Sequence, residues 1–303
     1  MIVTPSSSRR FAYAALAGAG TLWGASFLFG KLALAEMGAA TLVFYRFVLA
    51  AAALLPLVPW RRTAWARTDT LLALVGACMA GPLVFLLQFE GLDRTTASSA
   101  ALLVATAPPM MALGGAWLDR ERPGRWAWVA VGLSALGVVL LVGTPSRGRT
   151  LVGDAMVFAS MVSAVSWTLL ARRLARRVGV LAATAVQFGL GALVLLPFML
   201  ALDGVPAPAY SAPAYSALGW TSVFVLGLGC TAVTFFLWNW ALLRVEAARA
   251  GVIGNLEPLV GSVLGVVFLN ESLGPYALAG AVCLLSAAVL ATVSDAPSAE
   301  VAA

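Results

Sequence analysis

Ten apolar stretches follow one another along the chain, separated by short polar connections. Each has roughly the 20 residues that a helix needs to cross the hydrocarbon core of a bilayer. The pattern therefore predicts an all-α integral membrane protein with ten transmembrane helices. The predicted spans are residues 11–34, 41–60, 71–92, 95–118, 125–143, 151–170, 180–202, 217–243, 247–269 and 275–293.

The composition makes lipid the solvent for much of this chain. Of the 303 residues, 61% are hydrophobic and 11% are charged, against roughly 25% charged in a typical soluble domain. The net charge of +6 does not indicate a nucleic-acid partner, because the arginines lie in short clusters between apolar stretches. We expect the lipid bilayer, and no nucleic acid, as a partner.

The basic residues predict the orientation of the chain, because Lys and Arg are enriched in cytoplasmic connections. With a cytoplasmic N-terminus, fourteen basic residues fall inside and four outside, and the C-terminus is also inside. Those inside are Arg9, Arg10, Arg61, Arg62, Arg67, Arg120, Arg122, Arg125, Arg172, Arg173, Arg176, Arg177, Arg244 and Arg249; those outside are Lys31, Arg94, Arg147 and Arg149, and Arg46 lies within a span.

Two prolines in corresponding places indicate an internal repeat. Glu257-Pro258 lies near the middle of the ninth span, and Ala107-Pro108 lies 150 positions earlier, in the fourth span. Proline removes a backbone donor and interrupts a helix, so Pro108 and Pro258 are the predicted helix breaks and gating points. The same shift pairs Glu271 with Glu121, Arg244 with Arg94 and Ala247 with Ala97.

The repeat predicts the organisation of the chain. Five spans per copy is an odd number, so the second copy enters the membrane inverted, and inverted repeats place a substrate site at their interface near the midplane. Both copies lie in one chain, so a monomer suffices for function, with a dimer left open. The predicted units are a flexible leader at 1–10, a first five-helix repeat at 11–146, a second at 147–294 and a short tail at 295–303.

Missing residue types exclude several kinds of chemistry. The chain has no histidine, which excludes His-based proton relays, His metal ligands and Ser-His or Cys-His catalysis. The cysteines Cys78, Cys230 and Cys283 lie inside apolar stretches without metal-type spacing and are expected to pack. We therefore expect no enzymatic activity, no metal and no cofactor.

Several segments, taken in order, resemble the drug/metabolite transporter superfamily in its ten-span EamA type, over about residues 11–292. Within the superfamily the chain is most similar to the YddG-type exporters of aromatic and neutral amino acids. The segments that carry the resemblance are Trp23-Gly24-Ala25-Ser26-Phe27, Arg46-Phe47, Ala97-Ser98-Ser99-Ala100 with Pro108 and Glu121, Gly153-Asp154 with Trp167, Glu257-Pro258, and Asn270-Glu271-Ser272-Leu273.

The resemblance implies an alternating-access transporter that exports small metabolites, foremost neutral and aromatic amino acids, across a bacterial cytoplasmic (inner) membrane. An exporter of drugs or quaternary cations with the same fold is the alternative, since a membrane carboxylate and several tryptophans suit a cation equally well. An intramembrane enzyme or a channel fits less well. The sequence leaves open which substrates are carried and whether transport is coupled to protons.

Glu257 and Asn255 are the first candidates for substrate contact. A carboxylate at the centre of a membrane helix costs on the order of 2.5–3.5 kcal/mol, so it usually faces a partner or a wet cavity. Glu257 is a candidate for holding a substrate ammonium or a coupling proton; the alternative is a hydrogen bond between helices that fixes the break at Pro258. Asn255 either contacts substrate or satisfies a carbonyl that Pro258 leaves free.

Three tryptophans are candidates for lining the cavity between the repeats. Trp23 and Trp167 occupy related places in the two copies and lie too deep for an interfacial belt. Such a pair, with Trp238, suits an apolar or aromatic substrate side chain. Helix packing is the alternative role.

Three polar residues in the first copy complete the predicted site. Gln88 is a cavity candidate, whereas Glu90 lies closer to the outer surface and is expected to be solvated or to line the pathway. Arg46 lies about one and a half turns inside the second span. We expect it to snorkel or to pair with Glu90 or Glu257, with recognition of a substrate carboxylate as the alternative.

Overall fold

The computed structural model describes residues 5–63, 65–107, 109–110, 125–142, 148–204, 215–242 and 253–294. Within these ranges the chain is helical with short connections and contains no strand, which confirms the predicted all-α class for this part. Six helices are long and apolar enough to cross a membrane: Arg10–Leu34, Ala39–Leu57, Arg67–Arg94, Leu151–Val178, Val180–Leu202 and Ala217–Trp238. Trp128–Leu141, Leu256–Phe268 and Pro275–Leu290 are shorter apolar helices.

Every predicted span contains at least one helix, although several spans are divided. The fourth contains only α5 and a few following residues, because Pro108 and residues 111–124 lie outside the described part. In chain order the helices are α1 (Pro5–Leu34), α2 (Ala39–Leu54), η1 (Leu55–Leu57), η2 (Trp60–Arg62), α3 (Arg67–Cys78), η3 (Met79–Leu86), α4 (Leu87–Arg94), α5 (Ala97–Val104), α7 (Arg125–Val142), α8 (Leu151–Val178), α9 (Val180–Leu202), α10 (Ala217–Phe224), η4 (Val225–Val233), α11 (Thr234–Leu242), α13 (Leu256–Phe268) and α14 (Pro275–Ser294).

Hydroxyl side chains cap the N-termini of three of these helices. Thr96 accepts a hydrogen bond from the backbone N–H of Ser99 at the start of α5, and Thr150 accepts one from Gly153 at the start of α8. The Ser216 hydroxyl accepts from the first turn of α10. Each cap satisfies backbone donors that have no partner within the helix.

Two long helices change to π-helical geometry in their middle. Segment η3 joins α3 to α4, and segment η4 joins α10 to α11. In η3, Pro82 lacks the N–H that a regular ladder needs. In η4, the Thr231 hydroxyl donates to the carbonyl of Leu226, five residues back, at 2.8 Å. Such segments are rare and are found frequently at functional sites.

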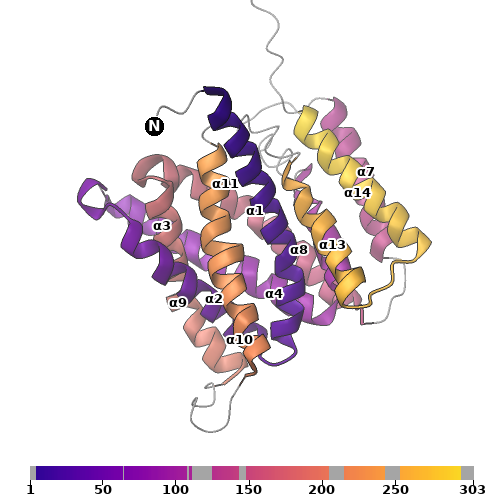
Figure 1. Cartoon of the computed structure of the whole chain (residues 1–303), viewed down its shortest axis with the longest axis horizontal. Coiled ribbons are helices and arrows are strands. Elements are labelled where there is room, and N and C mark those ends of the chain that lie inside the picture. The colour runs from indigo at the N-terminus through magenta and orange to yellow at the C-terminus, as the bar shows by residue number, and fades with distance from the viewer. Residues whose placement is uncertain are drawn as a thin grey trace, which may run out of the picture.

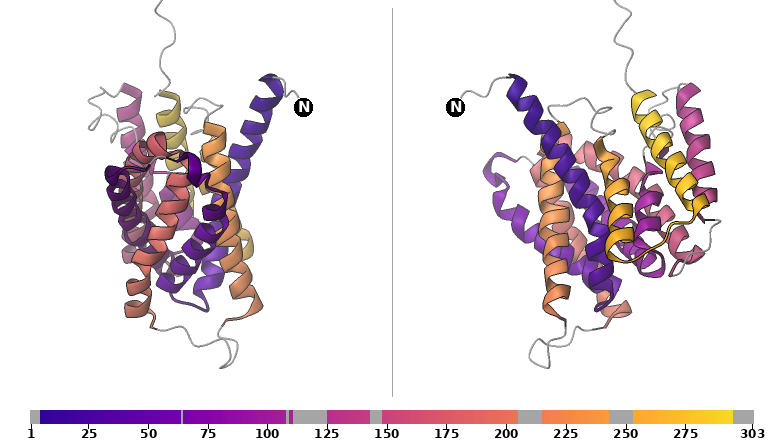
Figure 2. Two further views of the ribbon diagram at one scale, coloured as in Figure 1. Left: turned by 90° about the vertical axis from the view of Figure 1, so that its left-hand side faces the viewer. Right: turned by 45° about the vertical axis from the view of Figure 1, so that its right-hand side comes forward.

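The bundle divides into a main body and a peripheral pair of helices. Helices α7 and α14 pack against each other and stand at one side of the molecule (Figure 1; Figure 2, right). Their axes approach at two glycines: a Cβ on Gly137 would lie 2.9 Å from the carbonyl oxygen of Gly280. The other helices therefore form the main body of the bundle.

Segments far apart in the sequence pack together in the main body. Helix α13 lies against α1 and α5, α8 lies against α4, and α2 lies against both α9 and η4. A Cβ on Gly24 of α1 would lie 2.7 Å from the carbonyl oxygen of Glu257. This close approach brings the start of α13 next to the deep part of α1.

Residues 253–254 are helical, Asn255 is a turn residue and α13 begins at Leu256, so an interruption of the helix lies three residues before Pro258. Pro258 is the third residue of α13, in the first turn, where a missing N–H costs little. Helix α5 likewise ends at Val104, in the middle of the fourth predicted span. The predicted partner break at Pro108 lies outside the described residues.

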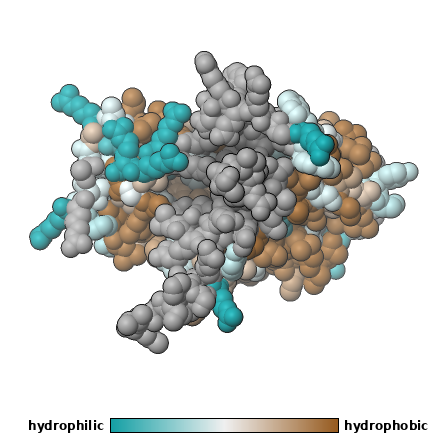
Figure 3. Space-filling view, turned by 90° about the horizontal axis from the view of Figure 1, so that it is seen from above, coloured by the Kyte–Doolittle hydropathy of each residue, from teal (hydrophilic) through white to brown (hydrophobic). Residues whose placement is uncertain are grey.

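Charged side chains gather at one end of the bundle. Figure 3 looks onto the end where α1 begins and shows hydrophilic side chains there, with apolar side chains around the flanks. Exposed arginines of this end include Arg10, Arg61, Arg67, Arg173 and Arg176. The apolar flanks are the surface that lipid would cover.

Candidate substrate site

Arg46 of α2 is a buried cation at the centre of the main body. Its side chain is 1% exposed, so the expected snorkelling does not occur. Its Nε donates to the Thr231 hydroxyl at 2.6 Å, and its Nη2 donates to the Cys230 carbonyl at 3.3 Å. Both acceptors belong to the π-helical segment η4.

The other π-helical segment supplies aromatic faces for the same cation. The Arg46 guanidinium lies 4.7 Å from the ring centre of Phe85, in η3, and 5.2 Å from that of Phe89, at the start of α4. Each such contact is worth about 0.5–2 kcal/mol. Arg46 is therefore held between η3 and η4, one from each half of the chain.

Glu257 carries the opposite charge and lies in the first turn of α13. Its side chain is partly exposed, and the helix N-terminus favours its negative charge. Arg46 and Glu257 attract each other, yet within the described residues neither forms a direct ion pair closer than 4.0 Å. The expected pairing of Arg46 with Glu90 is also absent there, because Glu90 pairs with Arg94. Arg46 and the acidic Glu257 are thus electrostatic neighbours without a direct ion pair in the described part of the chain.

Six aromatic rings run through the centre, each in edge-on contact with the next. Neighbouring ring centres are 5.0–6.2 Å apart with interplanar angles of 75–77°, a favourable arrangement for aromatic pairs. The order of residue types, one Trp, four Phe and one Trp, is the same from either end. We call this set the aromatic string; in order of contact it consists of Trp23, Phe235, Phe188, Phe47, Phe85 and Trp167.

The aromatic string joins the two halves of the chain, with three rings from each. The first half contributes rings from α1, α2 and η3, and the second from α8, α9 and α11. The contact of Phe47 with Phe188, at 5.0 Å, lies in the middle. A further contact of Trp167 with Phe235, at 5.8 Å, folds the string back on itself. Trp23 and Trp167, which the sequence places in related positions, are its two ends.

Trp238 extends the aromatic string toward the break before α13. Its ring lies 5.1 Å from that of Trp23, and a Cβ on Gly254 would lie 3.1 Å from its edge. Asn255 follows directly, at the N-cap of α13, but makes no capping hydrogen bond. Its buried Nδ2 has no partner in the described part of the chain, so Asn255 does not satisfy a carbonyl through this amide.

Several helices of the main body carry buried hydrogen-bond donors without a partner in the described part of the chain. Within the described residues, Arg46 Nη1, Trp167 Nε1 and Asn255 Nδ2 are buried and have no hydrogen-bond partner. Buried polar groups in native proteins are nearly always paired, so each exception needs an explanation. A substrate with acceptor oxygens is one explanation that covers all three donors.

Two other predicted residues, Gln88 and Glu90, lie on α4. Gln88 is partly buried, and its amide makes no hydrogen bond to the described residues. Glu90 pairs with Arg94 one turn later and lines a cavity at the end of the bundle. The structure therefore places Glu90 in the peripheral position that the sequence suggested.

The four phenylalanines of the aromatic string were missed by sequence reasoning. One signal was available: Arg46-Phe47 and Gln187-Phe188 each occupy the eighth and ninth positions of their helices, α2 and α9. Gln187 is also buried, with an Nε2 that lacks a partner in the described residues. A buried polar residue followed by phenylalanine thus marks the same place in both halves.

Neither of two cavities in the described part of the chain is lined by Trp23, Trp167, Trp238 or Glu257. A cavity of about 130 Å³ between α2, α9 and α11 reaches Phe235, with Leu54, Thr184 and Trp240 among its lining residues. A second, of about 720 Å³, opens at the end that carries Glu90 and Asp203. Of these two cavities, the smaller one reaches the aromatic string, through Phe235, and the larger one has no residue of the string in its lining.

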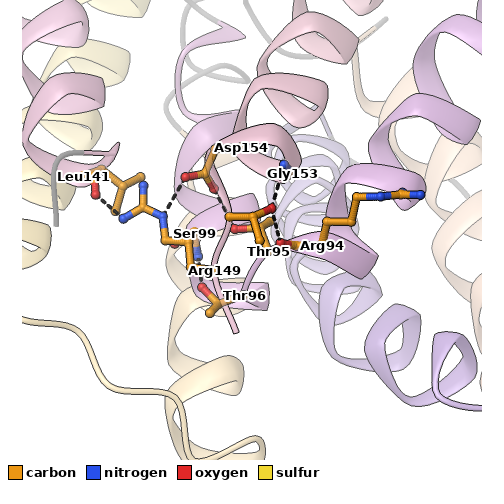
Figure 4. A network of polar contacts seen from close by, with 9 residues as sticks. Arg94, Thr95, Thr96, Ser99, Leu141, Arg149, Gly153 and Asp154 are labelled. Atoms are coloured by element: carbon orange, nitrogen blue, oxygen red, sulfur yellow. Dashed lines mark hydrogen bonds and ion pairs between the residues drawn. The ribbon is translucent and has the colours of Figure 1, made fainter. Parts of the chain in front are cut away.

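Carboxylates at the end that carries Glu90 and Asp203 accept several hydrogen bonds each or bind backbone N–H groups. Figure 4 shows Asp154, at the start of α8, between Arg149 and Thr95. Asp154 is 2% exposed; it accepts from Arg149 Nε at 2.6 Å and from the Thr95 hydroxyl at 2.6 Å. Arg149 also donates to the carbonyl of Leu141 in α7. The contacts connect α4, α7 and α8.

Three more carboxylates at the same end bind backbone N–H groups of the other half. Glu271 accepts from Ala97 and Ser98, at 2.6 and 2.7 Å, at the start of α5. Asp203 accepts from Thr41 at 2.6 Å, and Glu36 accepts from the backbone and hydroxyl of Ser216 at 2.6 and 2.5 Å. The Ser216 hydroxyl, followed by its N–H, lowers the pKa of Glu36. We call this end, defined by Glu36, Asp154, Asp203 and Glu271, the carboxylate end.

Apolar helices of membrane-spanning length around a buried polar centre define a multi-pass membrane protein. The chain belongs to the EamA-like transporter family, whose model matches residues 10–143 and again residues 151–293. It is therefore a membrane transporter.

Relatives and a solved structure agree with this membership. An "Uncharacterized transporter" of Archaeoglobus fulgidus is 28% identical over 282 residues, covering 89% of this chain and 93% of the relative. A "Probable biotin transporter" of Pseudomonas aeruginosa is 29% identical over 272 residues, covering 88% and 92%. A solved crystal structure, 19% identical, covers 95% of this chain and 97% of its own with a TM-score of 0.62, and thus shares the fold.

Proposed function

We propose that this transporter exports neutral and aromatic amino acids by alternating access, through a site built on the aromatic string. Aromatic rings suit an apolar or aromatic substrate side chain. Arg46, Glu257 and the unsatisfied donors suit its charged end. The single observation that carries the proposal is the aromatic string itself, because it joins both halves around buried polar groups.

The proposed architecture is ten spans in two inverted five-helix repeats, at 11–146 and 147–294, with both termini cytoplasmic. The double match of the family model, the two π-helical segments and the order of rings in the aromatic string support the repeat. The arginines at the end where α1 begins support a cytoplasmic location for that end. The membrane is then the cytoplasmic (inner) membrane of a bacterium, and one chain forms the whole path.

Transport requires the aromatic string to open, because its rings fill the centre. In alternating access, one repeat rocks against the other around a fixed site. The Phe47–Phe188 contact joins the halves through ring edges alone, whereas the carboxylate end joins them through charged hydrogen bonds. In the proposed cycle, opening would have to break the hydrogen bonds of the carboxylate end or those of Arg46 to η4, which also join the two halves.

A carrier of organic cations is the second candidate, favoured by the partly exposed carboxylate of Glu257 near two tryptophans. A cation held by a carboxylate and aromatic faces needs no partner for Arg46. In this alternative Arg46 only fixes η4 to η3, and the unsatisfied Nη1 is left without a role. We therefore rank the organic-cation carrier below the amino-acid exporter.

The test is uptake of radiolabelled substrates into liposomes that contain the purified chain. Phenylalanine, leucine, biotin and a quaternary ammonium compound are compared, with Trp167→Ala and, as a control, Trp128→Ala. Trp128 is 59% exposed on α7, so its loss leaves the aromatic string intact. Saturable, stereoselective amino-acid uptake that falls in Trp167→Ala and persists in Trp128→Ala supports the proposal. Saturable uptake of the cation alone supports the second candidate, and equal uptake in both variants removes the aromatic string as the site.

A further inference from the structure

We propose that the site takes a zwitterion, with the substrate carboxylate on Arg46 and the substrate ammonium on Glu257. The inference rests on the proposed function and narrows it to substrates that carry both charges. Its starting point is that Arg46 Nη1 and Trp167 Nε1 are buried without hydrogen-bond partners among the described residues, and that the acidic Glu257 forms no direct ion pair with Arg46 there.

Arg46 is held so that one nitrogen stays free. Its Nε is bound to Thr231 and its Nη2 to Cys230, while the aromatic faces of Phe85 and Phe89 lie beside the guanidinium. Nη1 is buried without a partner in the described part of the chain. A guanidinium is a fixed fork that binds carboxylates with defined geometry, and here the protein engages part of the fork and leaves Nη1 available.

A second donor adjoins the same aromatic ring. Trp167 lies 6.2 Å from Phe85, ring centre to ring centre, and its buried Nε1 has no partner among the described residues. Arg46 lies 4.7 Å from Phe85. Two unsatisfied donors beside one ring suit the two oxygens of a carboxylate better than they suit a neutral group.

Glu257 supplies the acidic group that complements Arg46. It lies in the first turn of α13, whose N-terminus favours a carboxylate there. Its side chain is partly exposed, although Arg46 is not. Once the aromatic string opens, a substrate ammonium at Glu257 would replace the distant attraction of Arg46 by direct contact.

Burying a charge without a partner costs free energy, and this cost determines which ligands the site accepts. A ligand with only a carboxylate leaves Glu257 without a cation, and a ligand with only a cation leaves Arg46 Nη1 without an acceptor. A zwitterion satisfies both groups at once. Neither biotin, which lacks the ammonium, nor a quaternary cation, which lacks the carboxylate, does so.

The experiment compares four probes: phenylalanine, phenylalanine amide, N-acetylphenylalanine and a quaternary ammonium compound. Each probe competes with labelled phenylalanine for uptake into liposomes, and each is tested for thermal stabilisation of the detergent-solubilised protein, which reports binding without flux. Removal of either charge is expected to weaken binding about tenfold or more, since hydrogen bonds to charged groups are worth about 1.5–3 kcal/mol.

Each variant is expected to remove the preference for one of the two substrate charges. Arg46→Gln removes the advantage of phenylalanine over its amide, and Glu257→Gln removes its advantage over the N-acetyl derivative. Arg46→Lys keeps a cation and retains part of the preference, which separates recognition from folding if Arg46→Gln is unstable. Gln187→Met, which removes a buried donor from the corresponding place in α9, leaves both preferences unchanged.

Two results overturn the inference. One is a protein that binds phenylalanine and its amide equally well, or phenylalanine and its N-acetyl derivative equally well. The other is a preference that persists in both Arg46→Gln and Glu257→Gln. If phenylalanine is still transported in these cases, the proposed function stands and only the charge assignment fails. If no amino acid is bound or transported, both fail together.

Discussion

The carboxylate end and the centre of this molecule treat their polar groups in opposite ways. At the carboxylate end, Glu36, Asp154, Asp203 and Glu271 all accept hydrogen bonds, and each accepts at least one from the other half of the chain. In the centre, Arg46, Trp167 and Asn255 each keep a buried donor without a partner among the described residues.

The difference separates polar groups that hold the structure from polar groups that remain available. A buried donor without a partner costs about 1–3 kcal/mol, so folding alone does not favour three of them. The carboxylate end shows that this chain can satisfy its polar groups where stability requires it. The unsatisfied centre is therefore best explained by a ligand.

The largest loss of stability is expected from Asp154→Ala. The change leaves Arg149 without its buried carboxylate, and breaking a buried pair in this way costs about 3–5 kcal/mol in free energy of unfolding. Thermal unfolding in detergent measures the loss. The double variant Arg149→Ala, Asp154→Ala is expected to lose less, because no uncompensated charge remains. A double variant that is less stable than Asp154→Ala would contradict this account.

A smaller loss is expected from Glu271→Gln. The amide accepts with one oxygen where the carboxylate accepted with two, so the first turn of α5 loses a charged hydrogen bond worth about 1.5–3 kcal/mol. Asp93→Asn is the control, since Asp93 is exposed at the same end. Equal unfolding temperatures for the two variants would show that Glu271 does not hold α5.

In the centre, the variant Trp167→Phe is expected to lower substrate affinity with little loss of stability. Trp167→Phe removes the unsatisfied Nε1 and keeps an aromatic ring, so the free energy of unfolding should change by less than about 1.5 kcal/mol while the affinity for substrate falls several-fold. Unfolding and substrate-competition measurements are made on the same preparation, with Trp128→Phe as control. A large loss of stability at unchanged affinity would identify Trp167 as a packing residue only.

The smallest effect is expected from Glu36, which is fully exposed. Its pKa lies below the ordinary value of 4.5, because Ser216 donates to the ionised form. A lowered pKa in the folded state means that the stabilisation is present above pH 4.5 and is lost as the pH falls through the lowered value. Wild type and Glu36→Gln should therefore differ in unfolding temperature near pH 7 and converge in acid. A difference that grows toward acid pH would contradict this assignment.

The sequence predicted the helices well because apolar stretches bounded by polar residues leave few alternatives in a bilayer. It also drew attention to Trp23, Trp167 and Glu257 through their places in the repeat. It did not predict the partners of Arg46, because the Cys230 carbonyl and the Thr231 hydroxyl become available through the π-helical geometry of η4. Periodicity along one chain does not reveal such a change.

The aromatic string was missed for a related reason. Its phenylalanines lie on four different elements of both halves, and phenylalanine in an apolar stretch is ordinary when each helix is considered alone. Only their contacts distinguish them. The sequence placed the helix break at Pro258, and it does not show that the interruption lies three residues earlier, at Asn255.

The two π-helical segments have a mechanical consequence for the membrane. Bends in long helices concentrate at π-bulges, so η3 and η4 place the deformable part of their helices midway between the two surfaces. The ends of these helices can then keep their depth among the lipid headgroups while their middles turn. A conformational change in this protein would accordingly disturb the surrounding bilayer least at its interfaces, where anchoring is strongest, and be absorbed within the hydrocarbon core.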